Sequence, residues 1–381
     1  MTLFDELSAT TRAAIEQDVV QDNLFVEDGL QKIVRFYANE RPYTGGLFNQ
    51  IPFVYDRPTG GASVPGGTRE VRDKQLLAAF SFGEREYIEE IPINEWKNKV
   101  INAGPNAAVD IYDTYMQLAV KAFNTDWNVG AYRHGQASSA TVAQDRSIYV
   151  NGMDEFLNDG INPGWMGNTY TTIGGETRNG TVGIGLNSIP LWCGDQAGAL
   201  GQVNFGALLE GYMQCIQKPD TGLCNRRLFT LIAMREEPKQ RFTQETDVRI
   251  GVTGFKIMDS FIHVDNLAPS TKFGALISAN VYGQESTIVP ADIAVGALTA
   301  AQTAISNFPA STTCKVGEPF FWLRLQDWVL TPASDPAFRH YFKGPIPSQD
   351  APDLEVIFYR EGVNWFTPSC RDNKLMLGFG A

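Results

Sequence analysis

Residues 50–93, QIPFVYDRPTGGASVPGGTREVRDKQLLAAFSFGEREYIEEIPI, begin and end with apolar side chains at alternate positions and are rich in glycine and proline between them. Ile51, Phe53 and Tyr55 have the two-residue spacing of a β-strand, and two phenylalanines repeat it on the return. Residues 56–68 contain four glycines and two prolines, a composition typical of a mobile loop. The pattern predicts one long β-hairpin over 50–93 with a glycine-rich tip.

Such a hairpin needs a second surface, because a two-stranded ribbon is only marginally stable in water. That surface is either the rest of this chain or a neighbouring copy of it. Arginines near the tip and glutamates on the return strand offer complementary charge for contacts between copies. The candidate intersubunit contact residues are Ile51, Phe53, Tyr55, Arg57, Arg69, Arg72, Phe80, Phe82, Glu84, Glu86 and Glu90.

The glutamates of the return strand also raise the question of catalysis. Glu84, Glu86 and Glu90 share one face of a strand, whereas Glu89 points to the other. Paired carboxylates can carry out glycoside hydrolysis. We favour a different interpretation, a charged strand on which Arg85 and these acids pair with neighbouring charges.

The strongest helix is predicted over 104–123. Apolar residues recur there every three or four positions from Ala108 to Phe123, and Asn106 is suited to cap the first turn. The pattern extends toward Tyr132, so we expect at least five turns.

The rest of the chain predicts a mixed α+β fold of short helices and strands. Further helices are expected near 30–37, 153–157 and 205–216, and strands near 228–233, 255–258, 261–264, 320–325, 328–331 and 354–359. The helix near 153–157 carries Asp154 and Glu155, with Asp159 just beyond it. These acids lack the spacing of a calcium loop, and we interpret them as a solvated face.

Composition narrows the class of protein. The 381 residues include 31 Lys and Arg against 43 Asp and Glu, a net charge of −12, which excludes a broad basic patch for nucleic acid. The five cysteines form no C-x-x-C pair and indicate reduced thiols, and the three histidines lie far apart in sequence. No apolar stretch is long enough to span a membrane.

Catalytic motifs are missing from the sequence. There is no phosphate-binding P-loop and no G-x-S-x-G nucleophile elbow. Cys193, in the stretch LWCGD, has no neighbour that would activate it, so a small buried thiol is favoured over a nucleophile. We predict no catalytic residue, no cofactor and no metal ion.

The order of a short arm, a glycine-tipped hairpin, a long helix and a mixed α/β body resembles the major capsid proteins of tailed bacteriophages, the Hong Kong 97-like fold. The hairpin, the helix over 104–123 and the stretch GFKIMDSFIHVDNLAP (254–269) carry the resemblance. The parts that it implies are an N-terminal arm (1–49), an extended hairpin loop (50–93), a peripheral domain with a long spine helix (94–149), a mainly axial domain at hexamer and pentamer centres (150–317) and closing strands of both domains (318–381).

The same resemblance implies a structural protein and no enzyme. It implies self-assembly as hexamers and pentamers into an icosahedral capsid around double-stranded DNA, without sequence-specific DNA binding or membrane contact. The expected location is the virion capsid, after assembly in the host bacterial cytoplasm. Because the arm beginning at Met1 is short, a separate scaffolding protein or none is implied, and portal and decoration proteins are further expected partners. Some relatives cross-link through a loop lysine, but residues 56–68 contain none, so noncovalent cohesion is expected.

Three alternatives stay open at this point. One is an encapsulin-type nanocompartment shell, which shares the fold and encloses cargo enzymes. Another is a different virion protein, such as a tail component. The third is a carbohydrate-active enzyme built on the glutamates of residues 84–90.

Overall fold

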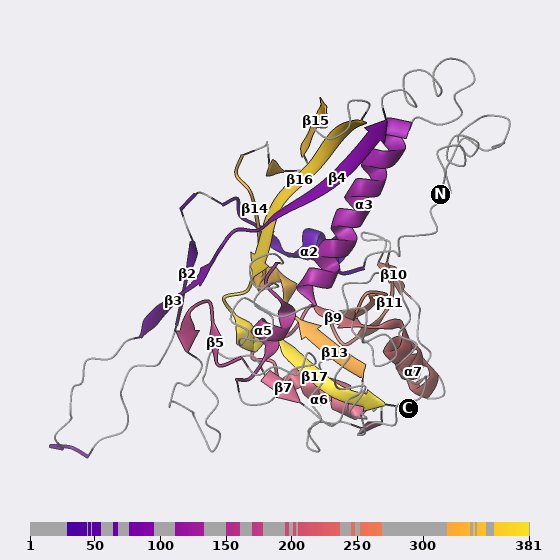
Figure 1. Cartoon of the computed structure of the whole chain (residues 1–381). Coiled ribbons are helices and arrows are strands. Elements are labelled where there is room, and N and C mark those ends of the chain that lie inside the picture. Colours follow the sequence, from indigo (N-terminus) through magenta and orange to yellow (C-terminus); the bar gives the residue numbers. More distant parts are fainter. Residues whose placement is uncertain are drawn as a thin grey trace, which may run out of the picture.

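The computed structural model describes residues 29–43, 45–46, 48–54, 64–67, 76–94, 111–132, 150–160, 170–177, 195–197, 201–202, 205–236, 245–247, 252–268, 318–335, 338–339, 341–347 and 354–380. These residues form two large β-sheets, two two-stranded ribbons and several helices (Figure 1). The mixed α+β class predicted from the sequence is confirmed.

The first large sheet is built around one long strand, β16 (Leu354–Phe366). On it pair β4, β14 and β15, all antiparallel, and β1 is parallel to β14. The bounds of these four strands are β1 (Asn39–Glu40), β4 (Glu86–Asn94), β14 (Val329–Pro332) and β15 (Tyr341–Pro347).

The second large sheet has the order β10-β11-β12-β9-β13-β17-β7, and β8 also pairs with β17. Its strands are β7 (Asp195–Ala197), β8 (Gly201–Gln202), β9 (Thr221–Cys224), β10 (Glu245–Asp247), β11 (Val252–Ile257), β12 (Ser260–Val264), β13 (Glu318–Leu323) and β17 (Lys374–Gly380). The last segment of the chain therefore supplies strands to both sheets, since β13 and β17 lie here and β14 and β16 lie in the first.

Helices cover both sheets. The long helix α3 runs beside β4 and β16, and α6 and α7 lie on the second sheet (Figure 1). The helices are α2 (Gly29–Tyr37), α3 (Ile111–Ala131), α5 (Met153–Leu157), α6 (Phe205–Gln214) and α7 (Arg226–Glu236). None of the helices in the described ranges is long and apolar enough to cross a membrane.

Most elements with a clear periodicity are confirmed. The predicted helix near 30–37 is α2, and the strongest predicted helix is α3, which continues to Ala131. The predicted cap Asn106 lies outside the described residues. The strand pair predicted at 255–258 and 261–264 is β11 and β12, joined antiparallel.

The strand predicted at 228–233 is wrong, because this segment lies in the helix α7. Leu228 and Ile232, four residues apart, are both fully buried on one helix face. The Asn225 side chain accepts a hydrogen bond from the Leu228 amide at 2.8 Å and so caps the helix. A short apolar run cannot distinguish a strand from a buried helix turn, and the cap decides the outcome here.

The hairpin predicted over 50–93 is also wrong at its end. Its return strand stops at Phe82, and β4 pairs with β16 instead, from Glu86 opposite Gly362 to Asn94 opposite Leu354. The reason is that side chains on one face of β4 are buried and those on the other are exposed. The buried face needs a helix to cover it, and the backbone of β4 needs a neighbouring strand for its hydrogen bonds.

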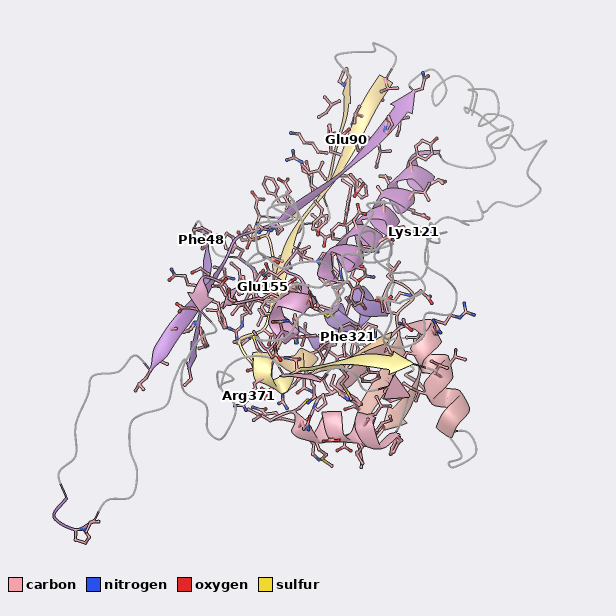
Figure 2. All side chains as sticks on the ribbon, turned by 60° about the horizontal axis from the view of Figure 1, so that its bottom comes forward. Phe48, Glu90, Lys121, Glu155, Phe321 and Arg371 are labelled. Carbon is pink, nitrogen blue, oxygen red and sulfur yellow. The ribbon has the colours of Figure 1, made fainter. Side chains whose placement is uncertain are left out.

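One hydrophobic core joins the two sheets. Tyr359 and Trp365 of β16 belong to the same buried cluster as Phe321 of β13 (labelled in Figure 2). The next residue, Trp322, points to the opposite face of β13 and packs under α6 and α7 in a second cluster. The second sheet is thus buried on both faces along β13.

The contact between β4 and α3 combines aromatic packing with a pair of acids. Phe123 of α3 meets Tyr87 and Tyr359 edge-on, with ring centroids 5.4 and 5.7 Å apart. Beside these rings, Glu89 forms a hydrogen bond with Asp126 of α3. Burial, followed by the charge of Asp126 and this hydrogen bond, raises the pKa of Glu89 to about 7.

This pair predicts an unusual dependence of stability on pH. Because the folded state binds the Glu89 proton more tightly than the unfolded chain, the free energy of unfolding should fall as the pH rises from 4.5 to about 7. Glu89→Gln keeps a hydrogen-bond donor without charge. At pH 8 the free energy of unfolding of Glu89→Gln should exceed that of the native protein by about 1 kcal/mol. This value is reduced for solvent screening, because the carboxyl is only half-buried.

Chemical denaturation at pH 5 and pH 8 measures the effect. Glu90→Gln, on the exposed face of the same strand, is the control and should keep the native pH dependence. If the free energy of unfolding changes by the same amount between pH 5 and pH 8 in the native protein and in Glu89→Gln, the prediction is contradicted.

Candidate interaction surface

The ribbon of β2 (Asn49–Val54) and β3 (Leu77–Phe82) projects from the side of the body (Figure 1). Its strands are antiparallel, with Asn49 opposite Phe82 and Val54 opposite Leu77. The hairpin core predicted from the sequence is therefore confirmed over these two strands. Because side chains alternate along each strand, the ribbon has an inner and an outer face.

The inner face anchors the ribbon on the chain's own core. Phe53 stacks on Phe80 with ring centroids 3.8 Å apart and planes within 8°. Phe82, at the base, lies 5.5 Å from the ring of Phe156 in α5 and 5.9 Å from that of Phe366 in β16. These rings are all buried, so they hold the base of the ribbon rigidly against the body.

A second ribbon supports the first from below. It consists of β5 (Thr172–Ile173) and β6 (Glu176–Thr177), and the carbonyl of its turn residue Gly174 accepts a hydrogen bond from the Ser81 amide at 2.8 Å. Gly174 has a φ of +52°, and a Cβ atom there would lie 2.9 Å from the Cβ atom of Phe80. Only glycine fits this contact.

Toward the tip, the outer face of the hairpin is apolar and exposed. Val54 and Leu77, directly opposite each other, are 67% and 64% exposed. Pro52 and Ala79 form the next pair on the same face, which we call the outer hairpin face. No described part of the chain buries Val54 or Leu77. Adjacent apolar side chains left open to solvent make this face a candidate for contact with another molecule.

A second exposed surface of the chain lies on the first sheet, on the side away from α3. Glu86, Ile88 and Glu90 of β4 are exposed there, and Arg360 of β16 lies among them with its Nε atom 3.8 Å from Glu86 Oε1. We call this surface the acidic sheet face; Figure 2 labels Glu90 on it. Of the three glutamates predicted to share one strand face, Glu86 and Glu90 do so, opposite Glu89. The prediction is wrong for Glu84, which lies outside the strand.

Between ribbon and sheet the chain bends at residues 83–85. The Asn364 side-chain amide donates to the Gly83 carbonyl at 2.7 Å, and the Val363 amide donates to the Arg85 carbonyl at 3.0 Å. Glu84 lies in this bend, outside the strand, where burial raises its pKa to about 7 against the opposing charge of Arg85. These hydrogen bonds from β16 fix the direction in which the ribbon leaves the body.

The interpretation of Asp154, Glu155 and Asp159 as a solvated face is wrong. All three are at most 1% exposed, because every residue of the short helix α5 is enclosed by the body. The Tyr170 hydroxyl donates to Asp154 Oδ2 at 3.0 Å, and Glu155 (labelled in Figure 2) acts electrostatically on Arg85 in the bend. Glu155 therefore acts on the bend at the base of the ribbon from inside the body.

The candidate contact residues divide into four groups. Phe53, Phe80 and Phe82 are buried within the chain, so contact with another copy falls to other side chains. Ile51 and Glu84 are half-buried, and Glu86 and Glu90 are exposed. Outside the described residues lie Tyr55, Arg57, Arg69 and Arg72. The contact role of the eleven residues stays a prediction.

Sequence reasoning missed Val54, Leu77 and Ile88, all of which are exposed. A signal was present, because Val54 and Leu77 are apolar residues at the positions of the ribbon where solvent-facing side chains are usually polar. Reading that signal requires the register of β2 on β3.

Side chains suited to catalysis or metal binding are sparse in the described part of the chain. There, no three His, Cys, Asp or Glu side chains gather where they could hold a metal ion. Cys215, Cys224 and Cys370 are buried and form no disulfide, and His263 is buried in β12 with its ring 5.7 Å from that of Phe261. The geometry supports a surface that binds another macromolecule.

Comparison with known proteins finds solved structures with a similar fold. No protein-family model and no curated protein matches the chain. The capsid asymmetric unit of cyanophage A-1(L) is similar with a TM-score of 0.57 and 10% identity, covering 96% of this chain and 98% of that one. The capsid of the empty GTA particle, computed with C5 symmetry, has a TM-score of 0.52 and 12% identity over 95% and 100%.

A structure of Mycobacterium phage Che8 is similar with a TM-score of 0.51 and 8% identity, covering 96% of this chain and 97% of that one. At such identities the comparison bears on the fold alone. Over nearly its whole length, the chain has an α+β fold similar to those of these three structures.

Proposed function

We propose that this chain is the major capsid protein of a tailed bacteriophage, which self-assembles as hexamers and pentamers into an icosahedral shell around double-stranded DNA. The proposal is carried by the similarity to capsid structures along nearly the entire chain. The projecting ribbon, with an apolar face that the described part of the chain leaves exposed, supports it independently.

In this proposal each part of the fold has a role in the shell. The helix α3 is the spine of the peripheral domain, with the first sheet beside it. The second sheet, with α6 and α7, belongs to the axial domain near the hexamer and pentamer centres. Residues 1–49 act as the arm, and the ribbon with its tip acts as the extended loop.

The outer hairpin face docks on a neighbouring copy. A contact between two different surfaces of identical chains is heterologous, and repeated around an axis it closes a ring. Val54 and Leu77 supply apolar area to this contact, and burying them removes from water the side chains that the isolated chain exposes.

The acidic sheet face of one copy faces the arginines near the ribbon tip of another. Glu86 and Glu90 are exposed on this face, where Glu86 also lies 3.8 Å from Arg360 of its own chain. Their partners in this proposal are Arg57, Arg69 and Arg72. Each pair contributes little alone, on the order of 0.2–1 kcal/mol, but each recurs in every copy of the shell. The charges also select the orientation in which two copies meet.

The remaining partners follow from the same proposal. The shell is part of the virion and forms in the host bacterial cytoplasm. It encloses DNA without sequence-specific contacts, which agrees with a net charge of −12. Scaffolding, portal and decoration proteins are the expected partners, and the chain performs no catalysis.

Negative-stain microscopy of the purified chain tests the proposal. We expect closed shells, or rings with fivefold and sixfold symmetry. A compact monomer under all conditions would contradict the proposal. In particles isolated from cells, DNA inside supports a phage capsid, whereas enclosed protein instead of DNA would identify a nanocompartment.

The outer hairpin face has its own test. The double variant Val54→Asp, Leu77→Asp should fold with a Tm within about 2 °C of the native protein, because both positions are exposed in the isolated chain. It should fail to form shells, since assembly would bury two uncompensated carboxylates in each contact. Thr230→Asp, on the exposed face of α7, is the control and should assemble. If the double variant forms normal shells, the outer hairpin face is not part of the contact between copies.

Charge exchange tests the pairing of the acidic sheet face. Glu86→Lys with Glu90→Lys should abolish assembly at low salt by placing like charges together. Adding Arg57→Glu, Arg69→Glu and Arg72→Glu should restore assembly. Light scattering measures assembly in both variants. Loss without rescue would show that these arginines are not the partners of the two glutamates.

A further inference from the structure

One edge of β4 has no partner strand in the described part of the chain. The other edge pairs with β16, and no further described strand is hydrogen-bonded to β4. Figure 1 shows β4 at the border of the first sheet, on the opposite side of β16 from β15. An edge strand with open backbone groups is a template on which another strand can pair.

The register on β16 decides which backbone groups of β4 point to the open edge. The Val363 amide donates to the Arg85 carbonyl at 3.0 Å, and these residues are directly opposite when the register is extended by one position. In an antiparallel pair, hydrogen-bonded positions alternate with positions whose N–H and C=O groups both face away from the partner. Glu86, Ile88 and Glu90 therefore direct their backbone groups to the open edge.

Pro92 agrees with this alternation and ends the open row. Proline has no amide hydrogen, so within a sheet it is tolerated where that position faces away from the neighbouring strand. Pro92 follows Glu90 by two residues in β4 and thus also faces outward. An incoming strand finds three successive donor and acceptor positions, bounded by the bend at residues 83–85 and by Pro92.

The opposite edge of the same sheet is built differently. There β15 contains Pro345 and Pro347, and its register on β16 is irregular between Lys343 and Ile346. Prolines and irregular register are devices by which sheets prevent further pairing. The contrast marks β4 as the edge of this sheet that can accept a strand.

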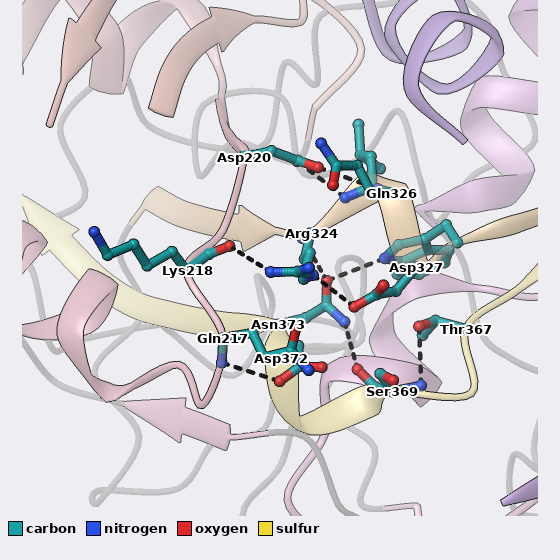
Figure 3. A network of polar contacts seen from close by, with 12 residues as sticks. Gln217, Lys218, Asp220, Arg324, Gln326, Asp327, Thr367, Ser369, Asp372 and Asn373 are labelled. Atoms are coloured by element: carbon teal, nitrogen blue, oxygen red, sulfur yellow. Dashed lines mark hydrogen bonds and ion pairs between the residues drawn. The ribbon is translucent and has the colours of Figure 1, made fainter. Parts of the chain in front are cut away.

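The polar groups at the junction between the two sheets, in contrast, bind one another (Figure 3). The Asn373 side-chain oxygen accepts hydrogen bonds from the Arg324 amide at 2.9 Å and the Trp328 indole at 3.0 Å. Its side-chain nitrogen donates to the Ser369 carbonyl at 3.0 Å. These bonds join residues that follow β13 to residues that precede β17. This polar cluster therefore serves the joint inside the chain, whereas the edge of β4 is open to a partner.

The side chains at the open edge define the chemistry of the partner strand. Glu86, Ile88 and Glu90 alternate along one exposed face, and Ile88 is 44% exposed. Residues directly opposite on a paired strand share that face. Glu86 lies 3.8 Å from Arg360, whereas no ion pair of Glu90 occurs within the described ranges. Two basic side chains flanking an apolar one would complement this pattern.

A second copy of β4 does not fit this edge. Two antiparallel copies centred on Ile88 would place Glu86 of each opposite Glu90 of the other, and like charges directly opposite are destabilising. The β2–β3 ribbon and the edge strand β10 contain no lysine or arginine. Charge complementarity therefore favours a basic strand from a different protein.

We propose that the open edge of β4 binds an antiparallel strand of another protein, in which two basic side chains flank an apolar one at alternate positions. The backbone of this strand exchanges hydrogen bonds with Glu86, Ile88 and Glu90, and its basic side chains lie beside the two carboxylates. In the proposed shell the same carboxylates face arginines of a neighbouring copy. The two contacts exclude each other, so the strand binds before assembly; this order alone rests on the proposed function.

The fluorescein-labelled peptide Thr-Arg-Thr-Val-Thr-Arg-Thr has the required pattern. Its fluorescence anisotropy is measured with unassembled chain, separated from shells by size exclusion. We expect saturable binding that weakens as the salt concentration rises. A peptide with glutamate in place of both arginines should bind at least about tenfold more weakly, because like charges would then lie opposite each other.

Two N-methylated peptides distinguish strand pairing from simple charge attraction. In the proposed pairing, the amide of the central valine points to β4 and the amide of the preceding threonine points away. N-methylation of the valine should weaken binding at least about tenfold, because it removes a backbone hydrogen bond. N-methylation of the threonine is the matched control and should have little effect. Equal affinities of the two methylated peptides would overturn the proposal.

Ile88→Pro tests the same hydrogen bond from the side of the chain. It removes the outward amide hydrogen and keeps the hydrogen bonds to β16, as Pro92 does two positions beyond Glu90. The variant should fold and lose peptide binding. Ile88→Thr, which keeps the amide, is its matched control and should bind the peptide. If Ile88→Pro does not fold, the methylated peptides decide the question with the native chain.

Unchanged binding by folded Ile88→Pro would also overturn the proposal, as would a native chain that does not bind the arginine peptide. The binding measurement does not require shells. A chain that forms shells without binding the peptide would contradict the strand site alone, whereas a chain that binds the peptide but never forms shells would contradict the capsid function alone.

Discussion

The pairing of β4 with β16 is the constraint on which the rest of the molecule depends. The two strands are hydrogen-bonded from Glu86 to Asn94, and their shared inner face packs on α3. Because β4 is committed to β16, the chain must bend at residues 83–85 after leaving β3. That bend directs the β2–β3 ribbon away from the sheet. The same backbone hydrogen bonds that build the first sheet therefore leave one face of the ribbon exposed.

The ribbon shows how one element can serve both stability and interaction. Its inner face, with Phe53 and Phe80 stacked, contributes to the core of the chain, whereas its outer face presents Val54 and Leu77 to solvent. Alternation along a strand separates these tasks at the level of single residues. The buried acid Glu155 under the base, in electrostatic contact with Arg85, adds a polar anchor inside the body. In the proposed shell, the firmly held ribbon presents its outer face to a neighbouring copy in a fixed orientation.

Elements with a long, regular period were predictable, and those decided by distant contacts were not. The helix α3 follows from apolar residues repeated over five turns, and β11 with β12 follows from two strand-like runs separated by a turn. Residues 228–233 failed because a short apolar run fits a strand or a helix, and the cap at Asn225 with packing on β13 selects the helix. For the interaction surface, strand alternation predicted the orientation of Glu86 and Glu90, whereas Val54 and Leu77 became visible only through the register of the ribbon.

Amino-acid order alone is enough to predict an α+β chain with a glycine-tipped hairpin, a long helix and an excess of acidic residues, because periodicity, turn composition and charge are local properties. Packing selects what is not local: the choice of β16 as the neighbour of β4, and the burial of Asp154 and Glu155. Each of these depends on residues brought together from distant parts of the chain. A strand edge accepts any strand whose side chains fit, and a carboxyl group is charged or neutral according to what surrounds it. Those surroundings exist only in the folded chain.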